Sequence, residues 1–105
     1  MAEHEQSAAE SSAFEQVDPK LTVFALANGM DLTKSEEHRR LEWFHDGLER
    51  GMRVEPAAGG TFRVTAMAWK RKREDEALTA DLGQTVAVDA LFALLDDGIN
   101  ATNAL

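Results

Sequence analysis

The chain of 105 residues contains no cysteine, and this absence limits what it can fold into. Without cysteine there are no disulfides, thiolate zinc sites or cysteine nucleophiles, so a hydrophobic core must hold the fold. A single domain of this length buries roughly two thirds of its extended surface, which is enough for one modest core. The large apolar residues are mostly Leu and Phe, accompanied by many Ala, and this composition favours helix over sheet.

Charge is distributed unevenly along the chain, whose formal net charge is -8. Residues 1–19 contain five acids and no Lys or Arg, and residues 20–73 contain all 11 basic residues against seven acids. The remaining residues contain seven acids and no Lys or Arg. The acidic opening stretch has few large apolar residues, so it predicts a disordered tail over residues 1–17 and one small domain over 18–105.

The hydropathy of the chain predicts a protein outside membranes. No apolar run reaches the ~20 residues that a bilayer span requires. The N-terminus is acidic rather than basic and then apolar, so it does not have the pattern of a secretory signal. We therefore expect a cytoplasmic protein.

Two helices are predicted in the first half of the domain. Start and stop signals at residues 18–19 and 28–29 predict a short helix between them, although a strand also suits this apolar run. A capping box at residues 33–36 predicts a second helix that continues to residue 50. Its apolar stripe has helical spacing and consists of Leu41, Phe44, Leu48 and Met52.

The second half of the domain predicts a hairpin and a final helix. Residues 56–60 contain Pro, Ala and Gly and predict a hairpin loop between arms over 52–55 and 61–71. Along the second arm, apolar side chains alternate with Arg, Thr, Met and Trp, so the two sets point to opposite faces. A final helix is expected over residues 85–97, with Gly98 as its stop. The expected fold is α+β, with two or three helices packed on a β-hairpin.

The sequence offers little for catalysis, and we expect no enzymatic activity and no cofactor. Three of the four serines lie in the tail, and no phosphate-binding glycine motif is present. One face of the predicted second helix carries His38, Glu42, His45 and Glu49, which could hold a metal if a second copy completed the site. A solvated helix flank explains the same stripe more simply, so we expect no metal site.

Both tryptophans have arginine neighbours, and this is the main functional signal in the sequence. Trp43 faces away from the apolar stripe of the predicted helix, and Trp69 points away from the small apolar residues of the hairpin arm. The candidate protein-binding residues are Arg39, Trp43, Arg50, Arg63, Trp69 and Arg71. Exposed Trp and Arg are common in binding hot spots, so we expect an adaptor, regulator or inhibitor that binds another protein or its own copy as a homodimer. The alternative is that each indole covers a contact within the molecule, with arginine stems lying over it.

A second function class, nucleic-acid binding, depends on the basic centre of the chain. Four consecutive bases could contact a phosphate backbone: Lys70, Arg71, Lys72 and Arg73. Against this, the overall acidic charge repels nucleic acid, and three acids follow the basic run directly. The sequence therefore favours protein binding and leaves a nucleic-acid-associated regulator as the alternative.

Overall fold

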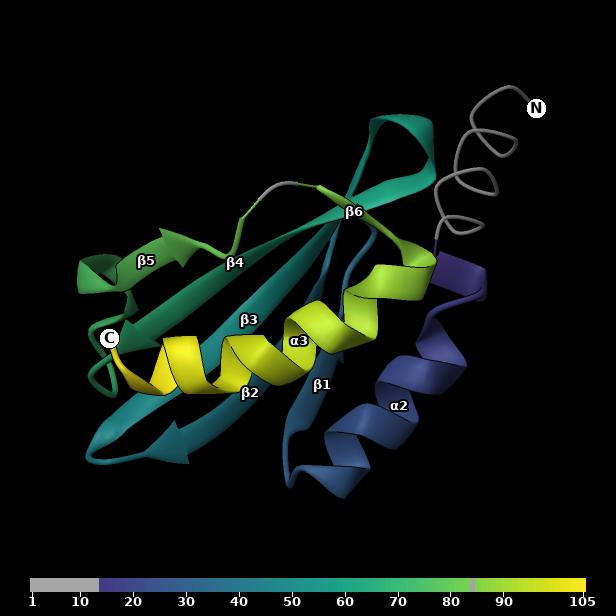
Figure 1. Cartoon of the computed structure of the whole chain (residues 1–105). Helices are drawn as coiled ribbons and strands as arrows, with labels where there is room; N and C mark the ends of the chain where they lie inside the picture. The colour runs from purple at the N-terminus through teal and green to yellow at the C-terminus, as the bar shows by residue number, and fades with distance from the viewer. Residues whose placement is uncertain (1–13, 84) are drawn as a thin grey trace.

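The computed structural model describes residues 14–83 and 85–105 (Figure 1). Their elements in chain order are α2 (Asp18–Ala27), β1 (Asp31–Lys34), β2 (Arg39–His45), β3 (Leu48–Ala57), the 3₁₀ turn η1 (Ala58–Gly60), β4 (Thr61–Trp69), the 3₁₀ turn η2 (Glu74–Glu76), β5 (Leu78–Asp81), β6 (Val86–Ala87) and α3 (Val88–Asn103). The expected α+β class and the short first helix are confirmed. The sheet is larger than the expected hairpin, since it has six strands.

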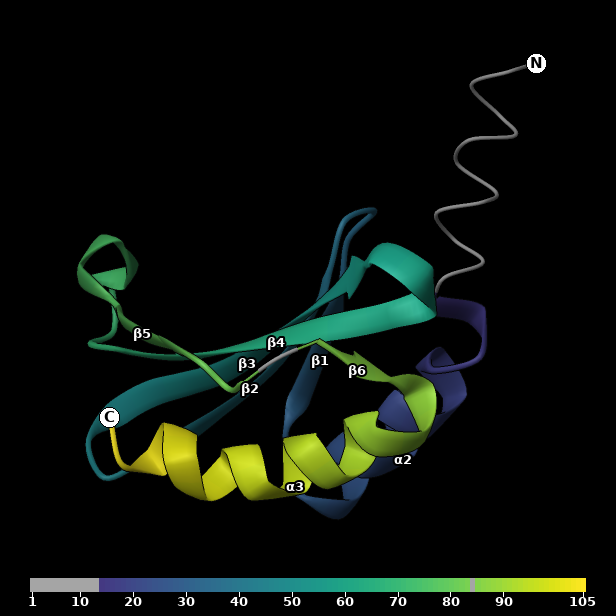
Figure 2. The same ribbon diagram turned by 45° about the horizontal axis from the view of Figure 1, so that its top comes forward.

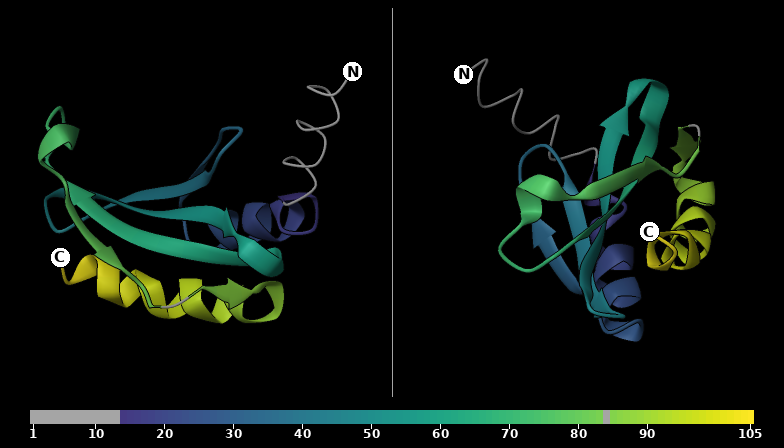
Figure 3. Two further views of the ribbon diagram at one scale, coloured as in Figure 1. Left: turned by 90° about the horizontal axis from the view of Figure 1, so that it is seen from above. Right: turned by 90° about the vertical axis from the view of Figure 1, so that its left-hand side faces the viewer.

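The strands form one antiparallel sheet in the order β1-β2-β3-β4-β5, so that each strand pairs with its neighbour in sequence. The short β6 pairs with the start of β4, on the side where β5 pairs with its end. Both helices lie on one face of this twisted sheet, with α2 against β1 and α3 across β3 and β4 (Figures 1 and 2). The opposite face carries neither helix, and we call it the open face (Figure 3). Neither α2 nor α3 is long and apolar enough to cross a membrane.

The core lies between the two helices and the sheet. Its large, fully buried apolar side chains are Phe14, Val17, Leu21, Leu41, Met52, Val54, Val64, Leu91 and Leu95. The expected alternation along β4 is confirmed, because Val64 and Ala66 pair with core residues of β3 on the helix-covered face and the odd-numbered residues lie on the other face. Phe14 and Val17 belong to this core, so the folded part of the chain begins before the expected boundary at Asp18. Residues 1–13 of the expected tail lie outside the described residues.

The predicted second helix is wrong, because residues 39–57 form the β2–β3 hairpin instead. Its two-residue turn is Asp46-Gly47, with φ angles of 51° and 82°. Asp-Gly is favoured in such turns because both central positions require positive φ. The apparent helical stripe divides between the two faces, since Leu41 is buried under the helices whereas Phe44 is 61% exposed on the open face.

Helix α3 continues past the predicted stop at Gly98 to Asn103. Gly98 is buried where Leu82 and Met52 come closest to the helix. A Cβ at this position would lie 2.6 Å from Leu82 Cδ1 and 2.8 Å from Met52 Sδ. The glycine therefore permits a close approach between helix and sheet rather than ending the helix.

A buried arginine binds the C-terminal end of α3. Arg50 of β3 is 2% exposed, and no side-chain carboxylate of the described residues pairs with it. Its Nη1 donates to the backbone oxygens of Thr102 and Leu105 at 2.6 and 3.3 Å, and its Nε donates to the carbonyl oxygen of His45 at 2.9 Å. The cation thus satisfies carbonyl groups that a helix end leaves free and faces the negative end of the helix dipole.

Replacing Arg50 by Ala should lower the free energy of unfolding by about 3 kcal/mol, because buried carbonyl oxygens lose their donor and a cavity opens. The matched control is Arg53→Ala on the same strand, where the side chain is partly exposed and binds Glu55. This control should cost less than about 1 kcal/mol. Urea unfolding followed by circular dichroism measures both variants. Equal losses would contradict a structural role of Arg50 at the end of α3.

Candidate functional site

The structure divides the predicted Trp and Arg surface between the two faces of the sheet. Three of its residues lie on the helix-covered face: Arg39, Trp43 and Arg50. The other three belong to the open face or its edge: Arg63, Trp69 and Arg71. A single surface that contains all six residues therefore does not form.

The tryptophan and arginines on the helix-covered face make contacts within the molecule. Trp43 is half-buried, and its Nε1 donates a hydrogen bond of 2.9 Å to Asn103 Oδ1 at the end of α3. Arg39 is 8% exposed and donates two hydrogen bonds, of 2.8 and 3.1 Å, to the Asp18 carboxylate in the first turn of α2. Its guanidinium carbon also lies 3.9 Å from the centre of the Phe14 ring. The expectation that Trp43 faces away from the core is wrong, because a strand turns it toward the helices.

Trp69 lies on the open face, yet it is only 9% exposed. Its ring lies close to β3, where a Cβ on Gly51 would be 3.4 Å from ring atom Cη2. The guanidinium of Arg40 lies 5.4 Å from the ring centre and binds Glu42 at 2.8 Å and Glu74 at 2.5 Å. The indole of Trp69 is therefore covered by Arg40 and its ion pairs, which belong to the same molecule.

The arginines of the open face are paired with carboxylates. The pairs are Arg40 with Glu42 and Glu74, Arg53 with Glu55, Arg63 with Asp81, and Arg71 with Glu49. In the most regular pair, the guanidinium of Arg63 donates two parallel hydrogen bonds of 3.0 and 2.7 Å to Asp81. A phosphate or an acidic partner on this face would have to displace these carboxylates.

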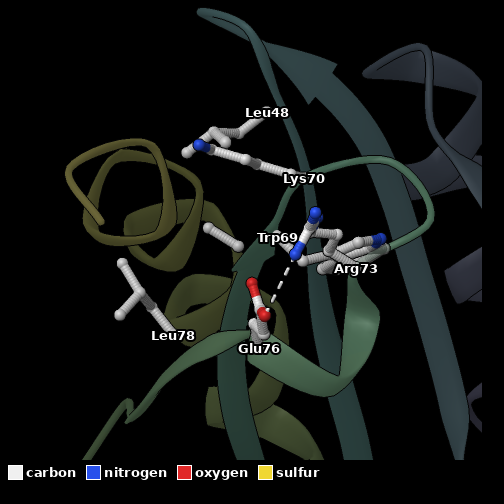
Figure 4. A pocket seen from close by; sticks show the side chains of 7 residues that line it. Leu48, Trp69, Lys70, Arg73, Glu76 and Leu78 are labelled. Carbon is white, nitrogen blue, oxygen red and sulfur yellow. Dashed lines mark hydrogen bonds and ion pairs between the residues drawn. The ribbon is translucent and has the colours of Figure 1, made fainter.

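The predicted nucleic-acid segment follows β4 and borders a pocket of about 350 Å³ (Figure 4). The pocket is lined by Leu48, Ala68, Trp69, Lys70, Arg73, Glu76 and Leu78. Within the basic run, Arg71 binds Glu49 at 2.9 Å and Arg73 binds Glu76 at 3.3 Å, while Lys72 is exposed. Both signs of charge therefore meet here, and the segment does not form a purely basic surface.

The stripe of His38, Glu42, His45 and Glu49, which the sequence placed on one helix face, is divided by the change from helix to strand. Glu42 and Glu49 point to the open face, where each binds an arginine, and His45 lies on the helix-covered side of β2. His38 lies in the turn between β1 and β2. Among the residues that the structure describes, no group of three or more His, Asp or Glu side chains is arranged to hold a metal ion.

An apolar groove of about 680 Å³ lies between α2 and α3, where the sequence predicted no site. It is lined by Pro19, Lys20, Val23, Phe24, Ala27 and Phe92. The rings of Phe24 and Phe92 join the two helices, with their centres 6.2 Å apart. Val23 is 66% exposed, and Leu26 on the same helix is 77% exposed. The groove and Leu26 together form a continuous apolar region on the outer side of α2, which we call the α2 face.

Helix α2 carries apolar side chains on both of its sides. The inner side buries Leu21 and Ala25, and the outer side presents Val23 and Leu26 to solvent. A surface helix normally has a polar outer side, and a helix that is apolar all round is normally buried. The α2 face therefore has the composition of a contact surface rather than of a solvated one.

The sequence did contain a signal of this groove. Consecutive apolar residues over 21–26 fit a strand as well as a helix, because both sides of the segment are apolar. Once the segment is helical, the same property leaves large apolar side chains on the outer side. The ambiguity between helix and strand thus reflected the apolar side chains that α2 exposes on its outer side.

Charged residues border the groove unequally. Lys20 on α2 is the charged residue that lines it, and it is exposed. On α3, Asp89 and Asp96 are exposed and lie three residues before and four residues after Phe92. Residues at this spacing share one side of a helix. The groove therefore has a basic rim on α2 and an acidic rim on α3.

Comparison of the chain with protein-family models, with curated proteins and with solved structures finds no match. The geometry alone therefore identifies the candidate site. The arginines of the open face already have partners, whereas the apolar side chains of the α2 face are in contact with solvent. We take the groove between α2 and α3 as the candidate functional site.

The ion pair between Arg63 and Asp81 gives the open face a pH dependence. Hydrogen bonds from Arg63 lower the pKa of the Asp81 carboxyl, and the same bonds raise the pKa of Arg63. The folded pKa of Asp81 lies below its unfolded value of about 3.9, so the pair stabilises the fold above that pH. This contribution is lost as the pH falls through the lowered pKa.

NMR titration of the Asp81 carboxyl carbon should give a midpoint below that of Asp in the denatured chain. Arg63→Gln removes the charged donor and should return the midpoint toward the ordinary value. The carboxyl of Asp31, which is exposed on β1 at the other edge of the sheet from β5, serves as the internal control. A midpoint of Asp81 that does not respond to Arg63→Gln would contradict the pairing.

Proposed function

We propose that this protein is a small non-enzymatic adaptor, regulator or inhibitor that acts by binding another protein chain through the groove between α2 and α3. The observation that carries this proposal is the exposure of Val23 and Leu26 beside an apolar groove of about 680 Å³. Covering apolar surface is favourable by roughly 25 cal/mol per Å², and exposed apolar patches commonly mark protein contacts.

A helix of the partner is the occupant that we propose for the groove. Its walls are two helices of 10 and 16 residues, which pack against each other through Phe24 and Phe92. The lining residues of α2 run from Pro19 to Ala27, about 12 Å along the helix axis, which corresponds to roughly two turns of a partner helix. Such helices present apolar anchors at positions i, i+3, i+4 and i+7.

The predicted Trp and Arg residues have an indirect role in this proposal. Arg39 binds the first turn of α2, whereas Arg50 and Trp43 bind the end of α3. These contacts orient the two walls of the groove without lining it. They are therefore positioning residues for the α2 face, and a partner is not expected to touch them.

The alternative of nucleic-acid binding has less support. A phosphate contact through the basic run would require Arg71 to leave Glu49 and Arg73 to leave Glu76. The three acids directly after the run would also repel phosphate. Among the described residues, Val23 and Leu26 beside the groove are largely exposed, so a contact there displaces no ion pair.

A photo-crosslinking amino acid at position 23 should form a discrete adduct with a protein in the cell that makes this chain. The matched control places the same amino acid at position 79, because Thr79 is exposed on the open face. We expect no discrete adduct at position 79. Mass spectrometry of the purified adducts identifies the partner. Adducts from position 79 alone, or no adduct from position 23, would contradict binding through the groove.

A further inference from the structure

We infer that the occupant of the groove is a second copy of this chain, so that the protein forms a two-fold homodimer through the α2 face. This inference rests on the proposed function, since it names the partner of the same groove. Two observations on this face carry it: the face has an apolar groove and, forming one wall of that groove, an exposed apolar ridge, and it has a basic residue on α2 and acidic residues on α3.

The ridge is the outer side of α2 itself. Val23, Leu26 and Ala27 are all exposed and occupy positions i, i+3 and i+4 of one helix. This is the anchor spacing that a helix uses to enter an apolar groove. Because ridge and groove lie on the same face, two copies related by a two-fold axis can exchange them reciprocally, as a closed dimer requires.

The charges around the groove favour the same arrangement. Lys20 lines the groove from α2, and Asp89 and Asp96 are exposed outside it, on the side of α3 that bears Phe92. When two copies meet across a two-fold axis, Lys20 of each copy approaches the acidic rim of the other, and the attraction occurs twice. The acidic outer side of α3 would repel its own copy, so the contact is centred on α2.

The remaining exposed apolar side chains do not form a competing surface. Among the described residues, the other large ones are Phe44 on β2 and Leu78 on β5. Phe44 and Leu78 lie on different strands, and the groove lies between the two helices. Single exposed apolar residues are common on protein surfaces. The α2 face is therefore the place where a second copy would bury several apolar side chains at once.

Sedimentation velocity of the full chain, from micromolar to submillimolar concentration, should show a monomer and dimer in equilibrium. Val23→Asp places a charge on the ridge and in the groove, and it should raise the dissociation constant at least about tenfold. The matched control is Thr79→Asp, which adds the same charge on the open face and should leave the equilibrium unchanged. Circular dichroism and thermal melting show whether each variant keeps its fold.

Reversing charges tests the expected attraction between Lys20 of one copy and the acidic side of α3 in the other. Lys20→Glu changes an exposed side chain and should weaken the dimer, because each copy then opposes acid with acid. Adding Asp96→Lys to the same chain should restore much of the affinity, since the attraction returns with its sign reversed. Failure of this rescue, together with an unaffected Val23→Asp dimer, would overturn the inference.

The outcomes separate this inference from the proposed function. In the purified protein, the photo-crosslink at position 23 should give an adduct of twice the mass of the chain. A chain that stays monomeric at every concentration, yet crosslinks through position 23 to a different protein, would overturn the second-copy inference and leave the proposed function standing. A monomer that forms no adduct at position 23 would overturn both.

Discussion

The buried guanidinium of Arg50 fixes the C-terminal end of α3 on the sheet, and the same helix contributes Phe92 to the groove. Apolar contacts of α3 have no preferred direction, whereas the hydrogen bonds from Arg50 to Thr102 and His45 are directional. The ion pair between Arg39 and Asp18 fixes the start of α2 in the same way. Because both helices are held on one face, their side chains meet and form the groove.

The open face and the helical layer differ in whether their exposed side chains have partners within the molecule. On the open face, arginines and carboxylates pair with one another, and Arg40 lies over Trp69. On the helical layer, Val23 and Leu26 have no such cover. Covering surface ion pairs changes the free energy little, whereas burying exposed apolar side chains is favourable. This difference is why the proposed contact lies on the α2 face.

Sequence patterns predicted the elements whose period was unambiguous. The alternation in β4 and the stripe of α3, with Leu91 and Leu95, match the structure. Over residues 39–50, apolar residues fit a helical period, but the Asp-Gly turn decides for a hairpin, and helix and strand place Trp43 on opposite sides. Trp43 was therefore assigned to the wrong side, whereas Trp69 and Arg63 lie on the side of the hairpin arm that the alternation predicted. The groove needs two helices distant in sequence, which no local pattern describes.

The most direct test of the account is to follow backbone amide chemical shifts by NMR while the protein concentration is raised. If a second copy occupies the groove, concentration-dependent shifts should cluster on α2 around Val23 and Leu26 and on α3 around Phe92. The amides of β5, including Thr79, should stay constant because the open face remains in solvent. Shifts that cluster on the open face while α2 stays constant would contradict the account.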